Sequence, residues 1–167
     1  LAVWLTRKFF RGAEGSGIPQ VIATLHARPG EYGARLLSFR ILFGKIAVSF
    51  LAILGGFTIG REGPTVHIGA AVMFSLGRFA RFPHHYMDKG LILAGGAAGI
   101  AAAFNTPLGG VVFAIEELTH TFEQRFSGLV LTAVLLGGIV TLGIVGPYSY
   151  LGALDLHLTW GLGWIGV

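Results

Sequence analysis

The sequence contains no cysteine and few charged side chains. The lack of cysteine excludes disulfide bonds and thiolate metal sites within its 167 residues. Only 12% of the residues are charged and 53% are hydrophobic, whereas soluble domains carry about 25% charged residues. Glycine is abundant, with 27 residues, as is typical of membrane helices, where small residues let helices pack closely. The composition therefore predicts an all-α, multi-pass integral membrane protein.

Other classes of function lack support in the sequence. The net charge is +4, but the basic residues lie in short connections between apolar segments, and no stretch is similar to a nucleic-acid-binding module. No nucleophile–base pair or metal-ligand cluster has a plausible spacing, so we expect neither an enzyme nor a bound metal or cofactor. The chain starts at Leu1 without the pattern of a signal peptide. We therefore expect a fragment of a longer protein.

The apolar runs predict helices of unequal length, since a span of the bilayer needs roughly 20 residues. The expected elements are the end of a membrane helix over 1–10, a half-helix or surface helix over 18–26, a spanning helix over 36–59, and helices over 66–79, 89–103, 108–118 and 127–145. The last of these is the cleanest span because it carries no charge. Residues 147–167 are expected to form an interfacial connection.

A helix break is predicted at Asn105-Thr106-Pro107. Broken helices at membrane depth occur where they are buried or line a cavity, and they recur in midplane binding sites. Before the break, Gly95 and Gly99 have the GxxxG spacing that is typical of closely packed helices.

The stretch Gly60–Ala70 has the composition of an anion-binding helix start. Its glycines allow a sharp bend and close approach to a ligand, and Pro64 suits a first helical turn. Free N–H groups and the positive end of the helix dipole favour an anion there. Glu62 is an acid in an apolar chain, which indicates function. We interpret it as a tethered anion that competes with a free one.

Two further polar residues lie in apolar runs. Lys45 falls deep in the expected helix over 36–59 and is expected to face protein or water, with snorkelling to the interface as the alternative. His67 is expected to be a packing or hydrogen-bonded residue.

Three motifs, in this order, resemble the signature blocks of the CLC family of voltage-gated chloride channels and chloride/proton antiporters. They are Gly15-Ser16-Gly17-Ile18-Pro19, Gly60-Arg61-Glu62-Gly63-Pro64, and the segment 101–108 followed by Glu116-Glu117. The resemblance implies a single transmembrane domain fragment over 1–167, approximately helices C to I of the first repeat. It also implies tilted and broken helices and about half of the inverted-repeat fold. Gln20, where glutamate is common, and Thr106, where alanine is frequent, depart from the family pattern.

The resemblance also implies an anion site around the first motif. Ser16 would donate its hydroxyl to the central anion, and Gly15 and Gly17 would shape its loop. Serine at this position is typical of family members that favour chloride, whereas proline goes with a preference for nitrate.

The second and third motifs imply a gate and a proton path. Glu62 would be the gating glutamate, with backbone N–H groups of Arg61, Glu62 and Gly63 as outer anion contacts. Glu117 matches the inner proton-transfer glutamate, whereas Glu116 is expected to be structural. A carboxylate at the position of Glu117 goes with proton-coupled exchange.

The expected function is transport of chloride across a membrane in exchange for protons. Two alternatives remain: a passive voltage-gated chloride channel with Glu62 as gate only, and a membrane packing module without transport. Chloride, protons and the lipid bilayer are the expected partners, with a homodimer at full length and the inner membrane of a prokaryote as location. The family's second-repeat anion-binding stretch is absent from the sequence, so this chain alone is not expected to complete a pore.

Overall fold

The computed structural model describes residues 2–27, 33–80, 85–119 and 124–146, and every regular element within these ranges is a helix. The expectation of an all-α protein is therefore confirmed. The interfacial connection predicted for 147–167 lies outside the described residues. The elements are α1 (Ala2–Phe9), α2 (Ile18–His26), α3 (Gly33–Leu36), α4 (Phe39–Leu54), α5 (Glu62–Phe79), α6 (His85–Phe104), α7 (Pro107–Phe113), the π-helix η1 (Ala114–Thr119) and α8 (Gln124–Val145).

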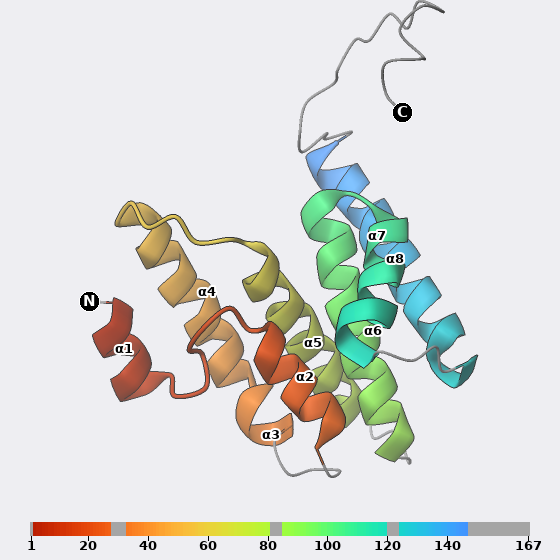
Figure 1. Cartoon of the computed structure of the whole chain (residues 1–167), viewed down its shortest axis with the longest axis horizontal. Helices are drawn as coiled ribbons and strands as arrows, with labels where there is room; N and C mark the ends of the chain where they lie inside the picture. Colours follow the sequence, from red (N-terminus) through yellow and green to blue (C-terminus); the bar gives the residue numbers. More distant parts are fainter. Residues whose placement is uncertain (1, 28–32, 81–84, 120–123, 147–167) are drawn as a thin grey trace, which may run out of the picture.

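The longer helices lie side by side, with α5 packed between α4 and α6, and α6 packed between α5 and α8 (Figure 1). The short helix α2 packs against α5, α6 and η1, and α7 folds back along α6. The buried core lies mainly along α5 and α6. This arrangement brings the starts of α2 and α5 to one region of the molecule.

Helices α5 and α6 approach each other through glycine. A Cβ atom added at Gly99 would lie 2.5 Å from the carbonyl oxygen of Thr65 on α5. A Cβ atom at Gly95 would overlap the carbonyl oxygen of Gly69. The two backbones are therefore in direct contact, and the close packing predicted from the GxxxG spacing is confirmed.

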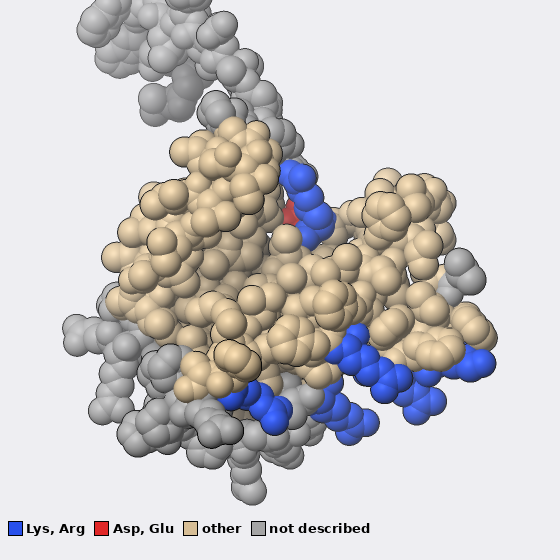
Figure 2. Space-filling view, turned by 180° about the vertical axis from the view of Figure 1, so that it is seen from behind, with Lys and Arg blue, Asp and Glu red and all other residues tan. Residues whose placement is uncertain are grey.

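The surface of the described helices is strongly apolar. Among the described residues, the segment Gly128–Val145 of α8 is long and apolar enough to cross a membrane. Large hydrophobic side chains are exposed on α4 and α8, including Phe43, Phe50, Ile139 and Ile144. On the face shown in Figure 2, most Lys and Arg side chains gather along the lower edge, one basic group lies in a hollow near the top beside an acidic side chain, and most of the remaining surface is uncharged. This pattern fits a protein whose helices face lipid or further protein segments.

Several predicted helix boundaries are wrong, including both ends of α4. Helix α4 begins at Phe39, where the Ser38 hydroxyl accepts a hydrogen bond from the Ile41 N–H at 3.4 Å, and it ends at Leu54 rather than at 59. Its end is set by Gly55 and by Gly56, whose φ of 80° is left-handed. The 16 residues of α4 extend only about 24 Å. Helix α5 begins at Glu62, so Pro64 lies in its first turn, as predicted, and the helix includes the residues before the apolar stretch over 66–79.

The predicted break lies at Asn105 and Thr106. Asn105 is left-handed, with a φ of 54°, and Thr106 is extended before Pro107 opens α7. The sequence did not predict that α7 continues as a π-helix, η1, in which the Thr119 hydroxyl donates to the Ala114 carbonyl at 3.1 Å. π-Helical turns are rare and concentrate at functional sites. The two glutamates of η1, Glu116 and Glu117, are therefore candidate functional residues.

Candidate functional site

The starts of α2 and α5 meet at Ser16. We call residues Gly12–Gly17, which lead into α2, the Ser16 loop. A Cβ atom at Gly63 would lie 2.5 Å from the carbonyl oxygen of Ser16 and 2.8 Å from its Cβ. Glycine at position 63 therefore lets the first turn of α5 contact the loop. The first N–H groups of a helix have no acceptor within it. Those of Glu62 and Gly63 belong to the turn that contacts the Ser16 loop through Gly63.

His67 packs beneath the end of the loop. A Cβ atom at Gly17 would lie 2.7 Å from the Cβ of His67, and Gly17 has a left-handed φ of 112°. The side chain of His67 is 1% exposed, and its Nε2 lies 2.9 Å from the carbonyl oxygen of Leu36. With Nε2 donating to that carbonyl, the ring links α5 to α3 below the loop. The predicted role of His67 in packing and hydrogen bonding is confirmed.

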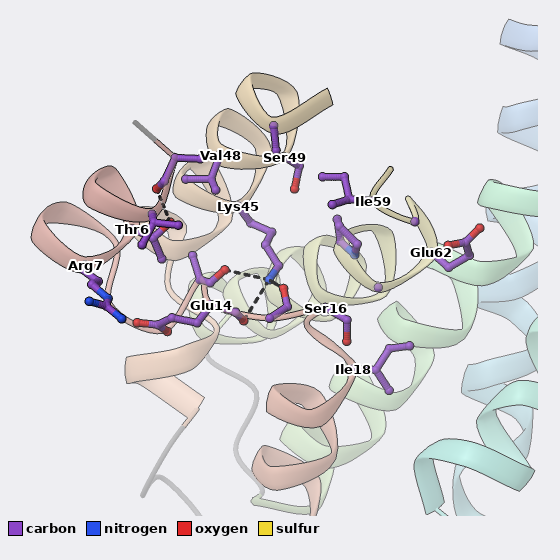
Figure 3. A pocket seen from close by; sticks show the side chains of 18 residues that line it. Thr6, Arg7, Glu14, Ser16, Ile18, Lys45, Val48, Ser49, Ile59 and Glu62 are labelled. Carbon is purple, nitrogen blue, oxygen red and sulfur yellow. Dashed lines mark hydrogen bonds between the residues drawn. The ribbon is translucent and has the colours of Figure 1, made fainter. Parts of the chain in front are cut away.

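Lys45 reaches the loop from α4. Its Nζ donates to the carbonyl oxygens of Ala13 at 2.9 Å and Gly15 at 2.8 Å, and it lies 3.4 Å from that of Glu14 (Figure 3). Lys45 is only 2% exposed. It therefore faces protein, and the alternative of snorkelling to the interface is wrong.

Gln20 holds the same loop from α2. Its Nε2 donates to the carbonyl oxygen of Glu14, and the Glu14 carboxylate accepts from the Gly12 N–H at 2.6 Å. An ionised glutamate at position 20 has no hydrogen to donate to this carbonyl. The departure from the family pattern at Gln20 therefore has a structural use in this chain.

A cavity of about 680 Å³ opens beside the loop. Its walls include Gly15, Ser16, Lys45, Glu62 and Gly63. Four of the predicted site residues thus line one cavity, which is reached by the starts of both α2 and α5. In Figure 3 the side chain of Glu62 points away from Lys45 and Ser16.

A second cavity, of about 740 Å³, lies on the other side of Glu62. It is lined by Glu62 and Ile18 together with Thr106, Glu116 and Glu117. Glu62 therefore lines both cavities, one with Ser16 and one with Glu117. Three segments that are far apart in the sequence meet here: the start of α2, the start of α5, and η1.

Two predicted contact residues, Gly17 and Arg61, are not among the residues that line these two cavities. Gly17 is buried against His67. Arg61 has an exposed side chain, and its carbonyl accepts from the Thr65 N–H at 3.1 Å and from the Thr65 hydroxyl at 2.5 Å. Arg61 thus closes the first turn of α5 through its carbonyl.

Sequence reasoning missed what Lys45 binds and where Glu116 lies. A cation within an apolar run was the available signal for Lys45, but its partners lie 30 to 32 residues away in the chain. Glu116, which was expected to be structural, lines the second cavity together with Glu117, its neighbour on η1.

The chain is similar to known proteins over most of its length. The family model described as voltage gated chloride channel matches residues 1–166. The chain is 42% identical over 145 residues to chloride channel protein CLC-c of Arabidopsis thaliana, an alignment that covers 77% of this chain and 18% of that protein. It is 36% identical over 138 residues to chloride channel protein CLC-d of the same plant, with 74% and 17% covered.

A bacterial relative is also similar. The H(+)/Cl(−) exchange transporter ClcA of Vibrio cholerae is 34% identical over 140 residues, with 83% of this chain and 28% of that protein covered. The chain thus spans between 17% and 28% of the length of these three relatives. Because the family model matches nearly every residue, the chain belongs to the voltage-gated chloride channel family of integral membrane proteins, whose members are transporters and channels rather than enzymes.

Proposed function

We propose that this chain forms part of a chloride/proton exchanger in which Glu62 serves both ions. One observation carries the proposal: Glu62 lines the cavity that contains Ser16 and also the cavity that contains Glu117. A carboxylate between an anion site and a second carboxylate can meet chloride on one side and a proton on the other. The chain covers a minor part of its relatives, so the activity proposed is that of the whole protein.

Chloride binds at the Ser16 loop in this proposal. The Ser16 hydroxyl and the N–H groups of Glu62 and Gly63 supply donors, Gly15 and Gly17 give the loop its shape, and Arg61 closes the turn beneath. The helix dipoles of α2 and α5 add partial positive charge at their N-terminal ends. Such dipoles stabilise an anion without a full counter-charge beside it, which suits an ion that must also leave.

Gating follows from competition for these donors. Ionised Glu62 is itself an anion and blocks chloride when its carboxylate turns toward the N–H groups at the start of α5. Protonation removes its charge and therefore its hold on those donors. The orientation in Figure 3, with Glu62 directed away from Ser16, leaves the space beside the loop open.

Protons reach Glu62 from Glu117 across the second cavity. The Vibrio cholerae relative is named as an H(+)/Cl(−) exchange transporter, whereas the two plant relatives are named as chloride channel proteins. The choice of the exchanger over the passive channel therefore rests on the carboxylate at Glu117. We further propose a homodimer at full length. The relatives come from a plant and a bacterium, so the comparison does not favour a prokaryotic inner membrane over other membranes.

Chloride-driven proton movement in liposomes tests the exchange. In the full-length protein, a chloride gradient should drive protons uphill, and Glu117→Gln should abolish proton movement while chloride flux persists, because glutamine cannot carry the proton. Glu116→Gln, a neighbouring change on the same cavity, should retain most of the coupling.

Three results would contradict this proposal. Chloride flux without proton movement in the unmodified protein would identify a passive channel with Glu62 as gate only. Equal proton coupling in the Glu117→Gln protein would show that protons take another route. Absence of any chloride flux in the full-length protein would favour the packing module.

A further inference from the structure

We infer that Lys45 is a positioning residue for the anion site: it holds the Ser16 loop in place by binding three of its successive backbone carbonyls. The inference rests on the proposed role of Ser16 in chloride binding. It assigns to Lys45 a task at that site which the sequence motifs do not include, since Lys45 lies outside all three of them.

The ammonium group of Lys45 binds three carbonyl oxygens of the loop at once. This group has three N–H donors, and the carbonyl oxygens of Ala13 and Gly15 lie 2.9 and 2.8 Å from Nζ, with that of Glu14 at 3.4 Å. Successive carbonyls of an extended chain point in different directions, so three of them meet one point only where the backbone turns. Gly12 and Gly15 supply that turn, with left-handed φ values of 112° and 65°.

The bound carbonyls stand directly before Ser16. The peptide unit that joins Gly15 to Ser16 carries the carbonyl at 2.8 Å from Nζ, so the position of Lys45 determines where the Ser16 hydroxyl lies. Gly63 contacts Ser16 from the other side. The serine is thus held between α4 and α5, and loss of the α4 side leaves it free to move away from the N–H groups of Glu62 and Gly63.

A rival account gives Lys45 a purely electrostatic role. Its side chain also lines the cavity that contains Ser16, and a positive charge there attracts any anion. The donors of Nζ, however, are directed at the loop carbonyls, as Figure 3 shows, and burial at 2% exposure leaves little freedom to turn elsewhere. The two accounts differ in one respect. If Lys45 positions the loop, its effect on chloride binding depends on the Ser16 hydroxyl, whereas direct attraction by its charge does not depend on that hydroxyl.

A double-mutant cycle separates them. Chloride affinity is measured by isothermal titration calorimetry on the detergent-solubilised full-length protein, with Lys45→Met, Ser16→Ala and the combined variant. We expect Lys45→Met to weaken chloride binding at least about tenfold, as loss of a charge-assisted hydrogen-bond network does. In the Ser16→Ala background, the same change should weaken binding less than about threefold, because the hydroxyl it positions is gone.

Two further variants provide rescue and control. Lys45→Arg keeps both charge and donors and should recover most of the affinity. Arg40→Met removes one positive charge from the exposed N-terminal turn of the same helix and should leave binding unchanged. Where Lys45→Met is not monodisperse, Lys45→Leu takes its place in the cycle, since leucine also removes both the charge and the donors.

The outcomes are distinct. An equal loss of affinity with and without Ser16 would overturn the positioning role and establish direct attraction by charge. An equal loss in Arg40→Met would also overturn it. If the unmodified protein binds no chloride, or if Ser16→Ala alone has no effect, the proposed chloride site at Ser16 is wrong. These results differ from those that overturn only the positioning role of Lys45.

Discussion

At position 63 a hydrogen atom is all that fits between the backbone of α5 and the Ser16 loop. The carbonyl oxygen of Ser16 would lie 2.5 Å from a Cβ atom there, and this oxygen belongs to a backbone that Lys45 and Gln20 hold in place. The loop therefore has little room to yield. This glycine is better explained by close approach than by turn geometry.

Gly63→Ala should consequently destabilise the protein and disturb the anion site. Alanine favours a helix by about 0.5–1 kcal/mol over glycine, but overpacking against fixed atoms costs about 1–3 kcal/mol. The cost of overpacking should therefore exceed the gain in helix propensity. Thermal denaturation should show a lower Tm, and chloride affinity should fall with it.

Gly128→Ala provides the matched control, because a Cβ atom there meets nothing within 4 Å. Its Tm should stay the same or rise slightly. A Tm of Gly63→Ala equal to that of Gly128→Ala would contradict the close contact between α5 and the loop.

The role of a single residue could be predicted from the sequence where its partners are close to it along the chain. Ser16 and Glu62 were found because the glycine and proline residues that shape their surroundings are sequence neighbours. The carbonyl partners of Lys45 and the Leu36 partner of His67 are about thirty residues away. Burial of the two side chains could be expected from an apolar context, but their partners required the fold.

The crossing of α5 and α6 is the main packing contact between elements. Gly69, Gly95 and Gly99 allow backbone atoms of the two helices to meet, and the buried core is continuous across this interface. Glu62 begins α5 and the helix break ends α6, so this crossing joins the two helices that carry these features.

Gly99→Ala should separate these helices. Its Cβ would lie 2.5 Å from the carbonyl oxygen of Thr65, and neither backbone can rotate away as a side chain could. We expect a loss of about 1–3 kcal/mol in stability, measured as a lower Tm of the purified full-length protein.

Gly143→Ala on α8 is the control here, since the added Cβ has no neighbour within 4 Å. A surface change of this kind should alter stability by no more than about 0.5 kcal/mol. Equal stabilities for the two variants would contradict a backbone contact at Gly99.

Helix boundaries were predictable where local chemistry sets them. The break at Asn105-Thr106-Pro107 was found because proline and asparagine are local signals. The end of α4 was missed because the apolar run continues past Gly55 and Gly56 to Ile59. The π-helix η1 was missed because hydrophobic periodicity does not distinguish one wide turn from an α-helix of the same composition. Glu116 and Glu117 both lie on this turn and line one cavity.

Over the whole molecule, Glu62 lies where the chloride and proton paths would meet. The first cavity joins it to the Ser16 loop, and the second joins it to η1. The remaining exposed apolar surface on α4 and α8 is available to lipid and to the parts of the protein that its longer relatives contain. In the proposed mechanism, chloride transport and proton transport therefore both depend on the carboxylate of Glu62.

The most direct test is the pH dependence of chloride flux in liposomes containing the full-length protein, with and without Glu62→Gln. Glutamine resembles the protonated carboxyl and cannot ionise, so the account predicts that flux in the variant no longer changes with pH and that proton movement is lost. In the unmodified protein, flux should increase as pH falls, because protonation removes the charge with which Glu62 competes for the site. A Glu62→Gln protein that keeps the original pH dependence, or that still moves protons against their gradient, would contradict the central role of Glu62.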